Sequence, residues 1–216
     1  QSISADGKFL VFTACNRKDG YGSCDLYYSE IRDGRWTPAA NIGSPINSRG
    51  WESQPSISAD GRAIYFTSNR KGGQGGKDIW ISYRQENRKW GKPQNLGDII
   101  NSPYDEQSPF IHADNQTLYF MSDGHPGMGG HDLFFARKKN EKEWFTPKNL
   151  GYPINTEAGE GALVLSLDGK TGYFASDTKN VKTDESVFDS GTKGGHTDLY
   201  SFELYKEARP QPVTYV

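Results

Sequence analysis

Three glutamates recur at equal spacing and are the residues of this sequence best suited to acid–base chemistry. Glu52, Glu106 and Glu160 follow one another at intervals of 54 residues. A glycosidase needs two carboxyl groups in different environments, one as acid and the other as base or nucleophile. Residues related by a repeat have similar environments, which favours a structural role in which each glutamate pairs with loop backbone or with an arginine such as Arg17 or Arg70. We therefore predict no catalytic residue and no enzyme.

Other motifs for chemistry are weaker still. His125 and His131 share one glycine-rich segment, but their spacing matches no established zinc pattern, and His196 belongs to another copy of that segment. The run Gly72–Asp78 contains Gly-Lys without the following Ser or Thr of a phosphate-binding loop. No Gly-x-Ser-x-Gly nucleophile motif is present. The sequence predicts neither a metal nor a cofactor.

Composition narrows the class of protein further. The 216 residues carry a net charge of −2, which argues against nucleic-acid binding because such proteins normally have a basic surplus. Aromatic residues make up 13% of the chain, too many for a disordered protein. The longest apolar runs, such as residues 9–12, are too short to span a bilayer. No signal peptide opens the chain, and we expect it to be a processed or excised segment of a longer protein.

The chain consists of four copies of one unit of about 54 residues. A turn dipeptide recurs at this interval in all four copies, as Asp6-Gly7, Asp60-Gly61, Asp114-Asn115 and Asp168-Gly169. Tryptophans keep the same step at Trp36, Trp90 and Trp144. We place the repeats near 1–54, 55–108, 109–162 and 163–205, together forming one domain over 1–205. Residues 206–216 are then predicted to be an extended linker toward a following domain.

Each unit is predicted to form a four-stranded antiparallel sheet. In the second copy, residues 56–58 and 63–68 flank an Asp-Gly hairpin, and 78–83 and a short segment around Trp90 follow. The middle strands are apolar almost continuously, so both sheet faces should be covered. Repeated sheets of this kind are typical of the blades of an all-β propeller. A parallel β-solenoid is the alternative, but its coils are usually shorter and lack the hairpins.

The repeat resembles a known family. Ser-x-Asp-Gly followed by an aromatic strand and Asp-Leu/Ile-aromatic is similar to the WD40-like repeat of TolB-type propellers. The extension Trp-x-x-Pro-x-Asn-Leu-Gly-x-x-Ile-Asn-Ser-x-x-x-Glu resembles propellers of OmpA-family outer-membrane lipoproteins from Bacteroidetes-type bacteria. The first copy departs from it with Ile42 in place of Leu, and the fourth lacks the tryptophan strand. The resemblance implies a periplasmic protein associated with the outer membrane.

It also implies partners: other envelope or secretion-system proteins, as in type IX secretion, and peptidoglycan through a domain outside this chain. The function expected is therefore a non-catalytic scaffold that binds proteins. The alternative is a carbohydrate-active propeller enzyme, either a glycosidase or a lyase, or a glycan-binding module, because propellers host these functions too.

A binding face can be predicted from loop lengths. The glycine-rich loops and the Ile-Asn-Ser segments should share one face, and the fourth copy adds an insertion there, between residues 176 and 198. Aromatic residues and arginines dominate interface energetics, so Arg49, Trp51 and Tyr104 are the candidate contacts. The repeated glutamates could ring the channel mouth on this face. The alternatives are that long loops only tolerate insertions and that the aromatics pack between blades.

The two cysteines of the first copy are predicted to pair. Alignment with the second copy puts Cys15 at the exit of one strand and Cys24 at the entrance of the next. Antiparallel pairing of these strands would bring the two Cβ atoms to within about 4 Å, as a disulfide requires. Free thiols in a reducing cytosol are the alternative.

Overall fold

The described part of the chain forms four antiparallel sheets. The structure is a computed structural model and describes residues 1–176 and 198–212. The first sheet contains β1 (Ser2–Ile3), β2 (Phe9–Cys15), β3 (Cys24–Arg32), β4 (Arg35–Trp36) and β5 (Ala40–Asn41). The second contains β6 (Glu52–Ile57), β7 (Ala63–Ser68), β8 (Asp78–Tyr83) and β9 (Gln94–Asn95). The third contains β10 (Glu106–Ile111), β11 (Thr117–Ser122), β12 (Asp132–Arg137) and β13 (Lys148–Asn149). The fourth contains β14 (Glu160–Leu165), β15 (Thr171–Ser176) and β16 (Asp198–Glu203).

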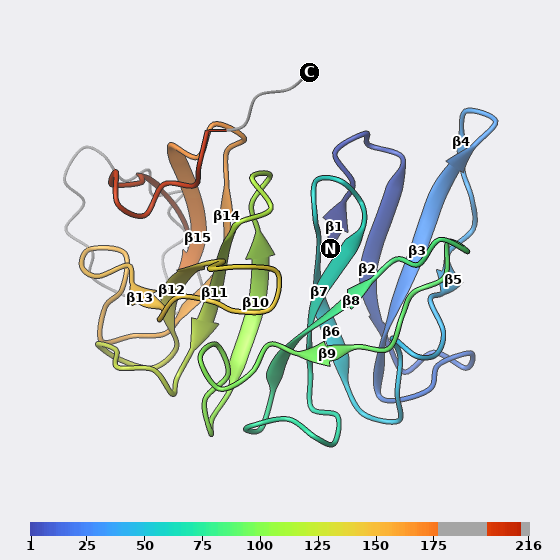
Figure 1. Cartoon of the computed structure of the whole chain (residues 1–216), viewed down its shortest axis with the longest axis horizontal. Helices are drawn as coiled ribbons and strands as arrows, with labels where there is room; N and C mark the ends of the chain where they lie inside the picture. The colour runs from blue at the N-terminus through green and yellow to red at the C-terminus, as the bar shows by residue number, and fades with distance from the viewer. Residues whose placement is uncertain (177–197, 213–216) are drawn as a thin grey trace.

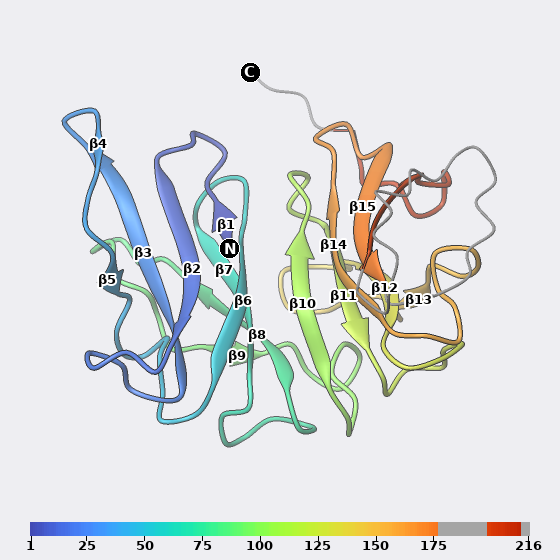
Figure 2. The same cartoon turned by 180° about the vertical axis from the view of Figure 1, so that it is seen from behind.

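This arrangement confirms the predicted fold, a β-propeller with four blades (Figure 1). Within each blade, strands that follow one another in sequence pair antiparallel, and β5 adds a second outer pairing to β3. Viewed from behind, the blades stand side by side with β1, β6, β10 and β14 toward the middle of the molecule (Figure 2). In the described ranges, no helix is long and apolar enough to span a membrane.

The hairpins between the first two strands form because one residue in each accepts a positive φ. Gly61 adopts φ +66° and its counterpart in the third copy, Asn115, adopts φ +55°. Glycine has no Cβ to clash there, and asparagine is among the few other residues that tolerate this conformation. The third copy therefore keeps the same turn despite its different sequence.

Successive residues of β7 pack against opposite neighbours. Phe66 joins a core with Val11 and Leu26 of the first blade, whereas Tyr65 joins a core with Phe134 of the third. All six residues of β7 are buried. Their nearly continuous apolar sequence is thus explained by blades on both faces, as the sequence predicted.

The innermost strands carry a repeated bulge. Gln54 of β6 and Ser108 of β10 both have positive φ, and the pairing with the next strand shifts register at each site. The Gln54 side chain accepts a hydrogen bond from the Ser108 backbone at 3.0 Å, which joins neighbouring blades. These strands line a central cavity of about 340 Å³.

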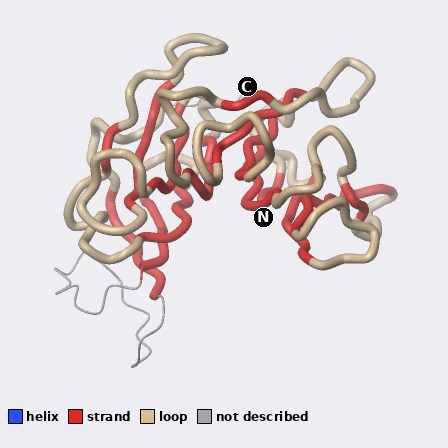
Figure 3. Tube along the Cα trace, turned by 90° about the horizontal axis from the view of Figure 1, so that it is seen from below, coloured by secondary structure: helices blue, strands red, loops and turns tan. Residues whose placement is uncertain are grey.

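The ring of four blades is open between its first and last members. No strand of the first blade contacts a strand of the fourth among residues 1–176 and 198–212, and Figure 3 shows the blades following an arc. Within the described ranges, the outer face of the fourth blade consequently has no neighbouring blade. Tyr173 and Leu199 are 42% and 55% exposed there, whereas their third-blade counterparts, Tyr119 and Leu133, are fully buried.

The segment after β16 packs on the propeller. Leu204 and Ala208 are fully buried in the core between the third and fourth blades. The Tyr119 hydroxyl donates to the Ala208 carbonyl at 2.5 Å, and Asp114 accepts from the Gln211 backbone at 2.8 Å. From residue 206 to residue 211 the chain therefore differs from the predicted extended linker, because apolar side chains and backbone groups find partners on the third blade.

Candidate functional site

The first of the repeated glutamates is enclosed by its own loop. Glu52 is fully buried, and its Oε2 accepts a hydrogen bond from the Ser48 backbone at 2.7 Å. Its Oε1 accepts from the hydroxyls of Ser48 and Ser68, each at 2.7 Å. Arg70 Nη2 lies 3.2 Å from the same oxygen. The carboxylate thus holds the Ile-Asn-Ser loop against the glycine-rich loop.

The other two glutamates occupy the same position in their blades. Glu106 accepts from the Ser102 backbone and hydroxyl, at 2.7 and 2.6 Å, and from the Ser122 hydroxyl at 2.7 Å. Burial raises the pKa of Glu106, and these hydrogen bonds oppose the rise. Thr156 donates to Glu160 from its hydroxyl at 2.7 Å. All three side chains are buried, so they do not form an exposed ring of acids.

The repeated asparagines also have structural partners. Asn47 accepts from the Leu26 backbone N–H and donates to the Leu26 carbonyl, both at 2.9 Å. Asn101 makes the same pair of bonds to Ile79. A side-chain amide is suited to this task because it offers one acceptor and one donor side by side. These residues fix the loops that carry the candidate contacts.

On the loop face, Lys77 links the segments that carry Trp51 and Tyr104. Its Nζ lies 5.6 Å from the ring of Trp51 and 2.8 Å from Oδ2 of Asp105, the residue after Tyr104. Trp51 is half-buried, so it is partly held by packing, whereas Tyr104 is 61% exposed. Arg49 is exposed two residues before Trp51. We call Arg49, Trp51, Lys77 and Tyr104 the loop-face cluster.

A disulfide lies at the edge of this cluster. Cys15 and Cys24 are bonded, and Cys24 also forms a bridge of the parallel type with Trp51. The backbone of Ser23 donates to the Gly50 carbonyl at 3.2 Å. The loop between the cysteines is thereby attached to the segment that carries Arg49 and Trp51.

The histidines that the structure describes do not converge on a metal site. His125 bonds through Nε2 to the Ile100 carbonyl at 2.8 Å, and His131 lies 3.1 Å from the Gln107 amide. No group of three potential ligands gathers in the part of the chain that the structure describes. His196 and the predicted insertion lie outside it.

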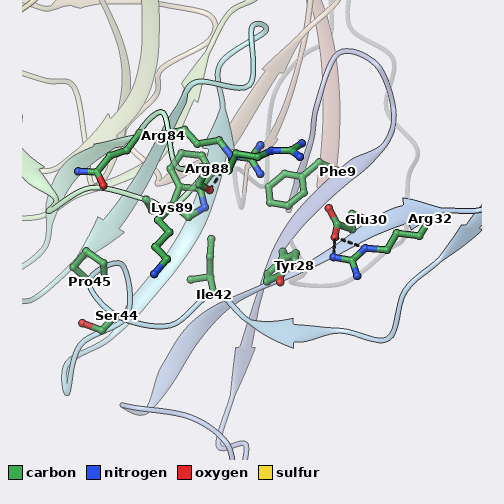
Figure 4. Close-up of a pocket in the computed structure, with 12 residues that line it drawn as sticks. Phe9, Tyr28, Glu30, Arg32, Ile42, Ser44, Pro45, Arg84, Arg88 and Lys89 are labelled. Carbon is green, nitrogen blue, oxygen red and sulfur yellow. Dashed lines mark hydrogen bonds and ion pairs between the residues drawn. The ribbon is translucent and has the colours of Figure 1, made fainter.

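A groove that the sequence did not predict lies between the first two blades, with a volume of about 690 Å³ (Figure 4). Phe9, Tyr28 and Trp90 supply aromatic rings to it. Arg84 lies between two of these rings, with its Cζ 5.4 Å from the centre of Phe9 and 5.6 Å from that of Trp90. The sequence feature that could have indicated this groove is Phe9, because the second and third copies have the smaller residues Ala63 and Thr117 at this position.

No protein-family model and no curated protein sequence matches this chain. Solved structures do match it. TolB from Acinetobacter baumannii is 15% identical with a TM-score of 0.58, over 94% of this chain and 40% of that one. A putative TolB from Agrobacterium tumefaciens is 13% identical with a TM-score of 0.61, over 96% of this chain and 61% of that one. An α-L-arabinofuranosidase from Lactobacillus brevis is 15% identical with a TM-score of 0.55, over 98% of this chain and 75% of that one.

At these identities the likeness shows the fold alone. The chain is a four-bladed propeller structurally similar to TolB propeller domains and also to a glycosidase propeller. It spans about two fifths and three fifths of the two TolB chains it matches. A shared fold does not carry a shared function.

Proposed function

We propose that this chain is a non-catalytic interaction domain of a bacterial cell-envelope lipoprotein, with the loop-face cluster as its binding surface. The observation that carries the proposal is that some loop residues are buried and structural whereas others are exposed. The repeated glutamates are buried and hydrogen-bonded within the loops, whereas Arg49 and Tyr104 are exposed on the two segments that Lys77 links through Trp51 and Asp105. Aromatic and arginine side chains in such positions commonly supply most of an interface's energy.

The compartment is proposed from the repeat sequence. Its resemblance to propellers of OmpA-family lipoproteins, and among these to the type IX secretion component PorE, supports a periplasmic domain associated with the outer membrane. A disulfide between Cys15 and Cys24 fits an oxidising compartment. Its partners are then envelope or secretion-system proteins, with attachment to peptidoglycan through a separate domain and no role for nucleic acid or a cofactor.

The binding face is tested by capture of envelope proteins on the immobilised domain. Alanine at Arg49 and Tyr104 should reduce capture of a specific partner at least about tenfold, a free-energy loss of about 1.4 kcal/mol. Alanine at the exposed Lys142 and Lys170, which lie outside the cluster, is the matched control and should leave capture unchanged. Equal losses from both pairs would rule out the loop-face assignment.

A carbohydrate-active or glycan-binding propeller is the second candidate. Two observations favour it: the structural likeness to an α-L-arabinofuranosidase, and the raised pKa of Glu106, a property that general acids need. A panel of polysaccharides separates the candidates. Turnover that is lost in the Glu106→Gln variant would replace the scaffold proposal with an enzyme.

A further inference from the structure

Neighbouring blades meet in two different ways at their outer edges. Between the second and third blades, Ala63 leaves room for Trp144, which is only 7% exposed and contacts the edge of Tyr65. Between the first and second blades, the position of Ala63 is taken by Phe9, and the tryptophan, Trp90, remains half-exposed. The larger side chain keeps this edge from closing. The groove of about 690 Å³ lies at this junction of the first and second blades.

The groove is rich in hydrogen-bond donors that carry positive charge. Arg84, Arg88 and Lys89 line it from the second blade, opposite Phe9 and Tyr28 of the first, as Figure 4 shows. The groove also contains Glu30 and Arg32, which pair with each other. Three cations are thus left without a carboxylate partner among the groove residues.

The Arg84 side chain is already held in a position to bind an anion. Its guanidinium is held between the rings of Phe9 and Trp90, so less conformational entropy is lost when it binds. Its Nε donates to the Arg88 carbonyl at 3.3 Å, and no residue within the described ranges pairs with its Nη atoms. The two Nη groups match the spacing of carboxylate oxygens. At the equivalent place between the next blades, Lys138 lies over the buried Trp144.

We propose that this groove binds a short acidic peptide segment, with carboxylates on Arg84, Arg88 and Lys89 and an apolar side chain against Phe9 and Tyr28. Lysine and arginine only donate, so the ligand must supply acceptors. Sugar hydroxyls need donors and acceptors in balance, which favours a carboxylate-rich peptide over a neutral glycan. The volume falls within the range of small-ligand sites. This site is separate from the loop-face cluster and independent of its function.

Fluorescence anisotropy with a labelled peptide that has glutamates on both sides of a central leucine tests the proposal. Saturable binding that weakens at high salt is expected, as is no binding of the same peptide with glutamines. Arg84→Ala should weaken binding at least about tenfold. Arg88→Glu combined with Lys89→Glu should also abolish it, and because these side chains are exposed on a turn, folding should be unaffected.

Two variants serve as controls for the effect of the groove substitutions. Lys138→Ala changes the equivalent cation between the next blades and should leave binding unchanged, as should Arg49→Ala on the loop face. No binding to the wild-type protein, equal binding of the glutamine peptide, or unchanged affinity of the Arg88/Lys89 variant would overturn the proposal. Tighter binding of a polyuronate than of the peptide would also overturn it, in favour of an acidic glycan.

Discussion

We predict that replacement by glutamine destabilises the protein more at Glu52 than at Glu106, although the two residues occupy equivalent positions in the repeat. Glu52 and Glu106 accept hydrogen bonds from serines at equivalent positions, but of the two only Glu52 pairs with an arginine, Arg70, whose side chain is 12% exposed. In Glu106→Gln, the amide carbonyl can still accept from the backbone of Ser102 while the amide NH₂ donates to the two hydroxyls. In Glu52→Gln, that NH₂ would instead face the guanidinium.

The magnitude follows from the burial of this ion pair. Breaking a buried pair typically costs about 3–5 kcal/mol, because one charge remains without its counter-charge. Arg70 keeps hydrogen bonds to the carbonyls of Pro45 and Ile46, which lowers the expected loss to about 2–3 kcal/mol. Glu106→Gln should cost about 1 kcal/mol or less. Urea unfolding at pH 7 measures both, and the two losses differ clearly if the argument holds.

Dependence on pH gives an independent check. Because burial raises the pKa of Glu106, the folded protein binds a proton more tightly there than the unfolded chain does. The contribution of Glu106 to stability is therefore greatest below the unfolded pKa of about 4.3 and falls as pH rises through the folded pKa. Glu106→Gln should consequently become less destabilising as pH rises. Equal losses for the two glutamine variants, or a trend of the opposite sign, would refute the assignment of their environments.

Two further predictions concern the disulfide and the open edge of the ring. Replacing Cys15 and Cys24 with serine should lower the free energy of unfolding by roughly 2–3 kcal/mol, and thiol labelling of unfolded, unreduced wild-type protein should detect no free thiol; two free thiols would contradict the bond. Tyr119→Ser should cost about 3–5 kcal/mol because it leaves a cavity, whereas Tyr173→Ser on the uncovered face should cost less than about 1 kcal/mol. Similar losses would mean that the fourth blade is covered in solution.

The fold was predictable because the residues that determine it lie within each repeat unit. Asp60-Gly61 fixes a hairpin through local backbone preference, and the apolar strand 63–68 requires cover on both sides. Such signals need only the residues of one unit. The tail beyond β16 was not predictable in this way, because Ala208 is held by Tyr119, a residue far away in the sequence.

The site shows the same division between repeated and particular residues. What recurs in three of the four copies, such as Glu52 and Asn47, holds loops together, since each of these copies must solve the same packing problem. Residues that differ between copies make the junctions between blades different. Phe9 in place of alanine leaves Trp90 half-exposed and Arg84 between two rings, and a groove results. In this chain the groove therefore follows from a position-specific departure from the repeat and not from the residues that define the repeat.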